Sequence, residues 1–221
     1  MLENQQGSVI INVMTKTQKD IIIGTILGDS YIAFSKSGKT HIEIKQADRY
    51  REYVFWLYNN LKYLFPVSVP KQRKDNDQWY VHSSFSEELN ELHRLFYIEG
   101  KKIIPSNIGE ILTSPLSLAV WFMDDGTLDY RLKDHCAFHL CTNCFTKDET
   151  QRLIDALYSN FGVKASMHYT LCRGKRHTRI YIGALGRERF IDLINPYIVD
   201  CFKYKLPDYR INYNTPQRLN L

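Results

Sequence analysis

The sequence predicts an α+β protein made of two similar halves, each with the order α-β-β-α-β-β-α. The chain has 221 residues, of which 44% are hydrophobic, so it can bury a core as one large or two small domains. An apolar run that ends in an acid occurs twice, at residues 22–30 and 118–126, and the two acids, Asp29 and Asp125, are separated by 96 residues. Because that separation is close to half the chain, we interpret the runs as an internal repeat that brings both carboxylates to one symmetric site.

In the first half, helical and strand-like hydrophobic spacing alternate. A helix is expected at residues 15–28, with Thr17 as a candidate N-cap and Ile22 and Ile26 on its apolar face. Strict alternation at residues 40–46 predicts a strand with one apolar and one polar face. The other expected elements are strands at residues 31–35, 67–73 and 78–83 and helices at residues 48–65 and 86–97.

The same order begins again after a connector at residues 105–113. Pro115 lies early in a helix that ends at Asp125, and proline is well tolerated in a first turn. Strands follow at residues 127–132, 136–142, 164–172 and 179–183, helices at residues 147–161 and 187–194, and a tail beyond residue 196. Because the chain has no low-complexity linker, we expect two halves, residues 1–105 and 106–221, that pack as one unit.

Charge and cysteine content narrow the class of protein. Lys and Arg outnumber Asp and Glu by 29 to 24, and this net charge of +5 favours a polyanionic partner such as nucleic acid. The five cysteines are an odd number confined to the second half, which is unlike a secreted disulfide framework and indicates an intracellular protein, in an organelle or the cytoplasm. The pair Cys141 and Cys144 has the C-x-x-C spacing but lacks a second pair, so packed free thiols are the simpler interpretation. No apolar run approaches the ~20 residues of a membrane span.

Two glycines explain why the repeated helices would meet. Gly24 and Gly28 lie on one helix face and allow another backbone, at Ala119, to approach closely. An Asp at the negative end of a helix dipole is unfavourable, and two such ends side by side are worse unless cations bind there. This favours a metal site at Asp29 and Asp125 over two buried helices whose acids are ordinary loop residues.

The two runs resemble the paired motifs of single-chain LAGLIDADG homing endonucleases. The second run, within Pro115–Gly126, is a specific match to the intron-encoded branch, and the segments Lys101–Pro105 and Tyr204–Pro207 are also similar to that branch. In the first run, Ser30 stands where the family usually has Gly. The resemblance covers almost the whole chain. It implies that each half carries an antiparallel sheet forming a DNA-binding saddle, joined at a two-helix interface. It also implies a monomer that cleaves both strands of a long, mostly asymmetric DNA target and leaves short 3′ overhangs.

The resemblance implies roles for individual residues. Asp29 and Asp125 match the metal-binding catalytic acids, with the backbone carbonyls of Gly28 and Asp124 as additional ligands. Mg²⁺ is the expected cofactor because it prefers carboxylate and phosphate oxygens and keeps several waters. Mn²⁺ is expected to substitute, and Ca²⁺ to bind without efficient cleavage.

Four further residues match positions near the acids. Lys102 and Lys205 match basic residues that polarise the scissile phosphate or order the water network, and the alternative is that both are solvated or phosphate-contacting lysines. Gln46 is similar in place to a polar residue that touches metal-bound water, and Asn143 is expected to be its counterpart in the second half.

The polar faces of the strands supply a candidate surface for double-stranded DNA. A two-stranded β ribbon fits the major groove, where Arg and Lys suit guanine and amides suit adenine. The alternative is an ordinary solvated face. The candidates are His41, Lys45, Lys71, Arg73, Tyr80 and His82 in the first half and His139, His168, Thr170, Arg173, Lys175, Arg176, His177 and Arg179 in the second.

Three other functions remain open at this point. An intron RNA maturase on the same fold could act with or without DNA cleavage, and retention of both acids argues against loss of nuclease activity but does not address RNA. A transcription regulator on this scaffold would be expected to lose the acids or to carry an added helix-turn-helix. This sequence keeps both acids and shows no added helix-turn-helix. The simplest alternative is a basic α+β domain without catalysis.

Overall fold

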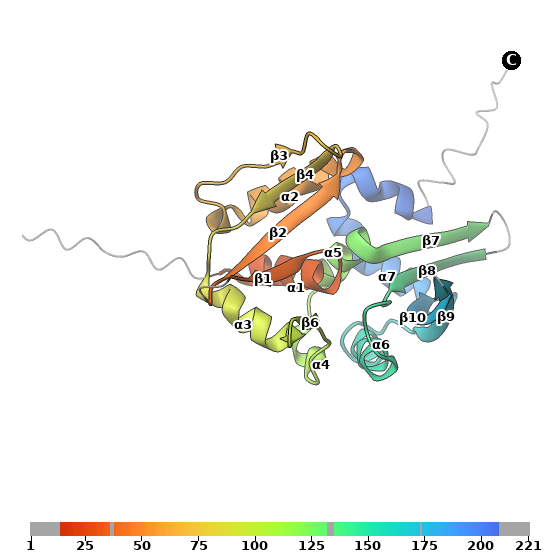
Figure 1. Ribbon diagram of the computed structural model, residues 1–221. Coiled ribbons are helices and arrows are strands. Elements are labelled where there is room, and N and C mark those ends of the chain that lie inside the picture. The colour runs from red at the N-terminus through yellow and green to blue at the C-terminus, as the bar shows by residue number, and fades with distance from the viewer. Residues whose placement is uncertain (1–13, 36–37, 132–134, 173, 208–221) are drawn as a thin grey trace, which may run out of the picture.

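Two helices in contact, α1 (Lys16–Leu27) and α5 (Pro115–Asp125), lie at the centre of the molecule with a sheet on either side (Figure 1). The computed structural model describes residues 14–35, 38–131, 135–172 and 174–207. Each sheet has four strands and the same antiparallel topology, β1-β2-β4-β3 in the first half and β7-β8-β10-β9 in the second. The repeated order predicted from the sequence is therefore confirmed as a repeated architecture.

In the first half, the helices pack against the core side of the sheet. After α1 its elements are β1 (Tyr31–Phe34), β2 (Thr40–Ala47), the 3-10 helix η1 (Asp48–Tyr50), α2 (Arg51–Asn60), the 3-10 helix η2 (Lys62–Leu64), β3 (Lys71–Gln72), β4 (Gln78–His82) and α3 (Glu87–Phe96). Ile42, Ile44 and Val81 face the core from the middle strands and are at most 2% exposed. The opposite face of the same strands is polar, as the alternation predicts.

The second half repeats this arrangement after a short link. The link holds β5 (Tyr97–Ile98), β6 (Lys101–Lys102) and α4 (Ile108–Ile111). After α5 come β7 (Gly126–Arg131), β8 (His135–Cys141), α6 (Lys147–Phe161), β9 (Ser166–Cys172), β10 (Lys175–Ile182), α7 (Arg187–Ile194) and the 3-10 helices η3 (Asn195–Tyr197) and η4 (Asp200–Lys205). None of the helices in the described ranges is long and apolar enough to cross a membrane.

Several boundaries differ from the sequence-based expectation. The N-cap of α1 is Thr15 instead of Thr17, because Thr15 and Gln18 form a reciprocal capping box. The expected strand at residues 67–73 is reduced to β3, whereas β10 begins at Lys175, before the expected residue 179. The β5–β6 hairpin was not anticipated, because strands of two residues carry no periodicity.

The segment expected to be a tail is part of the core. Phe202 of η4 is buried and its ring stacks on Tyr50 of the first half at a centroid distance of 4.7 Å. The hydroxyls of Tyr50 and Tyr204 are 2.6 Å apart. These contacts tie the end of the described chain to the first half, so the two halves are joined at η4 as well as at the central helices.

Candidate active site

The central helices approach closely because two positions on α1 lack a side chain. A Cβ added at Gly24 would lie 2.6 Å from the carbonyl oxygen of Ser117 and 2.6 Å from Val120 Cβ, and one added at Gly28 would lie 2.6 Å from Asp124 Oδ2. The sequence-based inference of a tight helix contact is therefore correct. The residues that face the glycines are Ser117, Val120 and Asp124, however, and not Ala119.

This contact brings the ends of the two helices, and the acids on them, together. Asp29 directly follows Gly28, the C-cap of α1, and Asp125 is the last residue of α5. Burial and, to a smaller extent, the charge of Asp29 raise the pKa of Asp125 to about 7, against the opposite effect of Lys102 and Lys205. The repulsion between two carboxylates is the electrostatic situation that a bound cation relieves.

The two predicted lysines bind the ends of these helices. Lys102 Nζ donates to the carbonyl oxygens of Gly28 at 3.0 Å and Ser30 at 2.9 Å. Lys205 Nζ donates to the carbonyl oxygens of Met123 at 2.6 Å and Phe122 at 3.3 Å.

Both ammonium groups are therefore placed at negative helix ends, where a cation is favourable. Burial lowers the pKa of each lysine, to about 8 for Lys205, while the nearby aspartates act to raise it. The alternative of two freely solvated lysines is wrong. The Gly28 carbonyl, expected as a metal ligand, also accepts a hydrogen bond from Lys102.

Gln46 contacts Asp29, the acid of its own half, whereas its expected counterpart, Asn143, makes no such contact. Gln46 Nε2 donates to Asp29 Oδ2 at 3.0 Å. Tyr31 pairs with Glu43 in the first half, and Thr127 pairs with His139 in the second. Both residues of the second pair follow those of the first by the same number of residues, and this offset makes Thr142 the counterpart of Gln46.

The assignment of Asn143 as the counterpart is therefore wrong by one residue. Thr142 is buried and its hydroxyl donates to the Thr178 carbonyl at 2.9 Å. Asn143 is exposed, and its carbonyl oxygen lies 3.1 Å from His177 Nδ1. The first half thus supplies an amide to its acid at this position, and the second half does not.

The donors present fit a hard divalent cation that keeps part of its water shell. A cleft of about 500 Å³ is lined by Asp124 and Asp125 together with Lys205, Tyr204 and Thr127. No group of three or more His, Cys, Asp or Glu side chains with ligand geometry forms within the described ranges. The protein would therefore hold a cation through carboxylates and backbone carbonyls and leave the other positions to water and phosphate, as Mg²⁺ prefers.

In the first half, the predicted DNA-contacting residues share one face of the sheet. Strand register places His41, Lys45, Tyr80, His82 and Lys71 on the polar side, away from α2 and α3. Arg73 lies in the turn after β3, where its Nε is 3.2 Å from Asp75 Oδ1.

Sequence reasoning missed the acid on this face. Glu43 lies beside Lys45 at 3.4 Å and His82 at 3.3 Å. Its position in the same alternation phase as His41 and Lys45 is the signal that could have identified it.

In the second half, the same analysis separates the candidates. His168, Thr170, Lys175, His177 and Arg179 share the polar face. His139 points the same way but is 7% exposed, beneath the stacked rings of His168 and Tyr181, and burial lowers its pKa to about 4. His139 therefore supports this face without presenting a free ring.

Two other candidates change status. Arg176 has the phase of the core residues Ile180 and Ile182, and its guanidinium lies over the Tyr169 ring at 3.9 Å, so it was wrongly grouped with Arg179. Arg173 lies outside the described residues.

Sequence reasoning also missed Asp129 as a candidate DNA-contacting residue on this face. Its Oδ2 lies 3.3 Å from His135 Nε2 and 4.0 Å from His139 Nε2.

Comparison with known proteins agrees with this geometry. The model of the LAGLIDADG DNA endonuclease family matches residues 19–190, a range that includes most of α1, all of α5 and both acids. The chain belongs to the LAGLIDADG DNA endonuclease family.

The relatives include endonucleases and maturases. The chain is 32% identical to the cytochrome b mRNA maturase bI2 of Debaryomyces hansenii, over 89% of this chain and 76% of that protein. It is 30% identical to a probable intron-encoded endonuclease of Wickerhamomyces canadensis, over 87% of this chain and 85% of that protein. It is 27% identical to the DNA endonuclease I-ChuI of Chlamydomonas applanata, over 88% of this chain and 96% of that protein.

Solved structures share the fold. The homing endonuclease I-WcaI bound to its DNA recognition sequence has a TM-score of 0.76 and 27% identity, covering 92% of this chain and 94% of that chain. A variant of I-DmoI, solved with its target DNA in the presence of Mg, has a TM-score of 0.50 and 16% identity, covering 81% of this chain and 96% of that chain.

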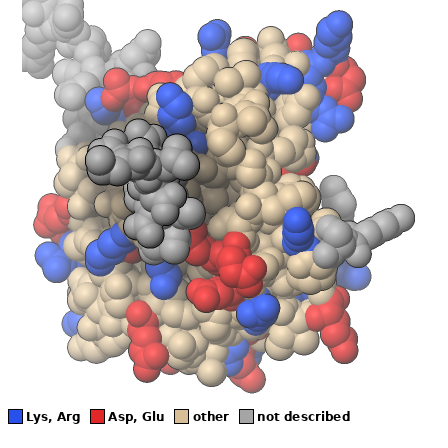
Figure 2. All heavy atoms as spheres, turned by 90° about the vertical axis from the view of Figure 1, so that its left-hand side faces the viewer, with Lys and Arg blue, Asp and Glu red and all other residues tan. Residues whose placement is uncertain are grey.

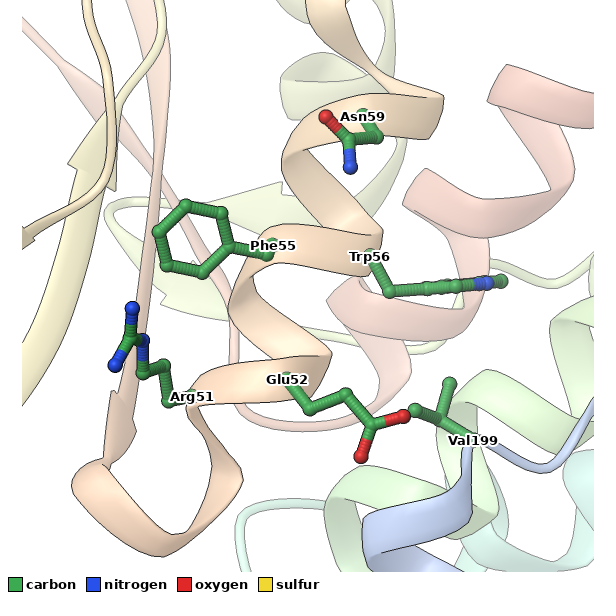
Figure 3. A pocket seen from close by; sticks show the side chains of 6 residues that line it. All are labelled: Arg51, Glu52, Phe55, Trp56, Asn59 and Val199. Carbon is green, nitrogen blue, oxygen red and sulfur yellow. The ribbon is translucent and has the colours of Figure 1, made fainter.

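One face of the molecule and one hollow on α2 differ from the acid site. On the side of the molecule shown in Figure 2, basic and acidic side chains are interspersed and form no continuous basic field. A hollow of about 530 Å³ on α2 has Glu52 as its one carboxylate, directed toward Val199 (Figure 3). Its other lining residues are Arg51, Phe55, Trp56 and Asn59. With a single acid, this hollow does not offer the paired carboxylates of a nuclease centre.

Proposed function

We propose that this protein is a monomeric, metal-dependent homing endonuclease that cleaves both strands of a specific double-stranded DNA site. The observation that carries the proposal is the placement of Asp29 and Asp125 at the ends of two touching helices, between two sheets of the same topology. The family membership and the DNA-bound structure of I-WcaI support a DNA substrate. The pseudo-twofold relation of the halves assigns one half to each DNA strand.

The chain's own residues perform distinct tasks in this reaction. Asp29 and Asp125 would hold Mg²⁺, which supplies an activated water and stabilises the attacking and leaving oxygens of the phosphodiester. Gln46 restricts the rotation of the Asp29 carboxylate through its 3.0 Å hydrogen bond. Lys102 and Lys205 fix the helix ends that carry the acids, and their ammonium groups add positive charge close to the position of the scissile phosphate.

The polar faces of the two sheets would read the DNA. The major groove of B-DNA is wide enough to admit a two-stranded β ribbon. Lys45, Lys71 and Arg179 are suited to phosphates or guanine, and Glu43 and Asp129 are suited to accept from the amino group of cytosine. Because these faces carry both acidic and basic side chains, they favour base-specific contacts over purely electrostatic binding to phosphates.

A supercoiled plasmid that carries the intronless insertion site of the protein's own gene provides the test. With Mg²⁺ the wild-type protein should convert the plasmid to nicked and then linear product, and end sequencing should show short 3′ overhangs. If that site is not cut, selection of cleaved products from a randomised DNA library gives the target directly. Failure to cut any member of the library would refute the proposal.

The maturase relatives favour a second candidate function. The protein most similar in identity among those described above is a cytochrome b mRNA maturase, and the match covers 89% of this chain. We propose intron RNA binding as an activity alongside cleavage. Filter binding to the host intron RNA, with a scrambled RNA of equal length as the control, would test it, and equal affinity for both RNAs would contradict it.

A further inference from the structure

The two positions related by the repeat at the ends of the central helices carry different residues. Gly28 precedes Asp29 in the first half, and Asp124 precedes Asp125 in the second. A Cβ on Gly28 would collide with Asp124 Cβ and lie 2.9 Å from Asp124 Cγ, so the Asp124 carboxyl group occupies the space that Gly28 leaves. The first half therefore provides a gap, and the second half fills it with a carboxylate.

That carboxylate contacts the backbone of the acid in the other half. Asp124 Oδ2 accepts a hydrogen bond from the backbone N–H of Asp29 at 3.3 Å. The N–H of Gly28 bonds to Gly24 within the helix, whereas the N–H of Asp29 finds its partner on α5. Asp29 is thus fixed at two points, its side chain by Gln46 and its main chain by Asp124.

The second oxygen of Asp124 lies in a buried environment. Asp124 Oδ1 and the Tyr53 hydroxyl are both buried, and neither has a hydrogen-bond partner among the described residues. Burial raises the pKa of Tyr53 most, and the negative charge of the nearby Asp124 raises it further. Tyr53 is 0% exposed on α2 of the first half, so the first half bounds one side of the Asp124 carboxyl group, while Asp124 also lines the cleft.

We propose that Asp124 is a positioning residue that fixes Asp29, so that α5 of the second half controls the catalytic acid of the first. This inference rests on the proposed function, because Asp29 is taken to be a catalytic ligand. Asp124 acts as a hydrogen-bond acceptor in this role, and an Asn at the same position keeps an acceptor oxygen. The repeat supplies no equivalent contact to Asp125, because position 28 has no side chain. Loss of the contact should therefore disturb the two DNA strands unequally.

The first measurement is hydrogen exchange of the Asp29 amide in metal-free full-length protein. Removing the acceptor in Asp124→Ala should speed this exchange about five- to tenfold, the effect of one typical hydrogen bond. Asp124→Asn should restore most of the protection. Tyr53→Phe, which keeps the acceptor but removes the buried hydroxyl close to the Asp124 carboxyl group, should give a smaller increase and serves as a second variant if Asp124→Ala does not fold.

The second measurement separates positioning from general destabilisation. Each strand of a target plasmid is end-labelled, and the nicking rate of each strand is measured for Asp124→Ala and for Gln46→Ala, which disturbs Asp29 from its other side. The two variants should slow the same strand preferentially, while Asp124→Asn recovers most of the lost rate. Binding to the target in Ca²⁺ should remain within about threefold of wild type, because the sheets that contact DNA are untouched.

The outcomes distinguish the two levels of the proposal. Unchanged exchange at Asp29 in both Asp124→Ala and Tyr53→Phe would overturn the positioning role. Equal slowing of both strands, without recovery in Asp124→Asn, would also overturn it. If Asp29→Asn itself cleaved at the wild-type rate, the proposed function would fail first, whatever the exchange data showed.

Discussion

Substitution of Gly24 by alanine measures how closely the two central helices must approach. A methyl group there would lie 2.6 Å from the Ser117 carbonyl oxygen and 2.6 Å from Val120 Cβ. Contacts of this kind require the helices to separate, and overpacking costs about 1–3 kcal/mol. The upper end applies because one partner is backbone that cannot rotate away. Alanine also returns up to ~1 kcal/mol of helix propensity.

The net expectation is therefore a loss of about 2 kcal/mol in the free energy of unfolding. For a chain of this size that loss lowers the melting temperature by about 4–8 °C. Urea unfolding followed by far-UV circular dichroism would give the change in midpoint. Cleavage should also fall, because separation of the helices moves Asp29 away from Asp125.

The matched control is Gly109→Ala in α4, where an added Cβ meets nothing within 4 Å. This variant gains helix propensity without a collision, so its stability should be unchanged or higher by up to ~1 kcal/mol. Equal urea midpoints for Gly24→Ala and Gly109→Ala would refute the argument that close helix contact is what requires glycine.

Three further predictions concern charge. Arg179→Ala should reduce the salt dependence of DNA binding by about one unit of slope per lost phosphate contact, whereas Arg176→Ala, on the opposite face, should leave the slope unchanged in a fluorescence-anisotropy titration. In metal-free protein the pKa of Asp125 is raised to about 7, so the folded state keeps a proton that the unfolded chain releases near pH 4. The free energy of unfolding should therefore fall as the pH rises from about 4 to about 7. Urea midpoints that stay flat over this range would contradict this expectation. Lys205→Met should lower stability by about 1–3 kcal/mol, because two helix carbonyls lose a buried charged donor, and the more exposed Lys102→Met should cost less in the same assay.

The helices of the second half show which structural features the sequence encodes locally. The bounds of α6 and α7 coincide with the expected residues 147–161 and 187–194. In α6 a capping box at Thr146 and Glu149 and a left-handed Gly162 mark the two ends. Signals of this kind lie within a few residues of each other, so a sequence pattern can detect them.

Features that depend on distant contacts could not be read in the same way. Thr142 and Asn143 are adjacent polar residues at a strand end, and the pairing register, which is set across the sheet, decides which one corresponds to Gln46. The position of Lys205 beneath Phe122 depends on a 3-10 helix whose sequence has no apolar periodicity.

The contact between Asp124 and Asp29 is the clearest case. The acid occurs in a conspicuous motif, but its partner is a backbone amide in the other half of the chain. The motif therefore predicted which acids lie at the ends of the two helices, and the structure was needed for the contacts between them.

Plasmid cleavage by the two acid variants tests the proposed active site most directly. Wild-type protein, Asp29→Asn and Asp125→Asn are incubated with the supercoiled target plasmid in Mg²⁺, in Ca²⁺ and in EDTA, and nicked and linear products are followed over time. The wild-type protein should linearise the plasmid in Mg²⁺ but not in EDTA, and should bind it in Ca²⁺ with little cutting. Each variant should still bind the target in Ca²⁺ and should fail to linearise it in Mg²⁺. Cleavage by the wild-type protein in EDTA, or linear product from either variant at the wild-type rate, would contradict a metal-dependent site built from these two carboxylates.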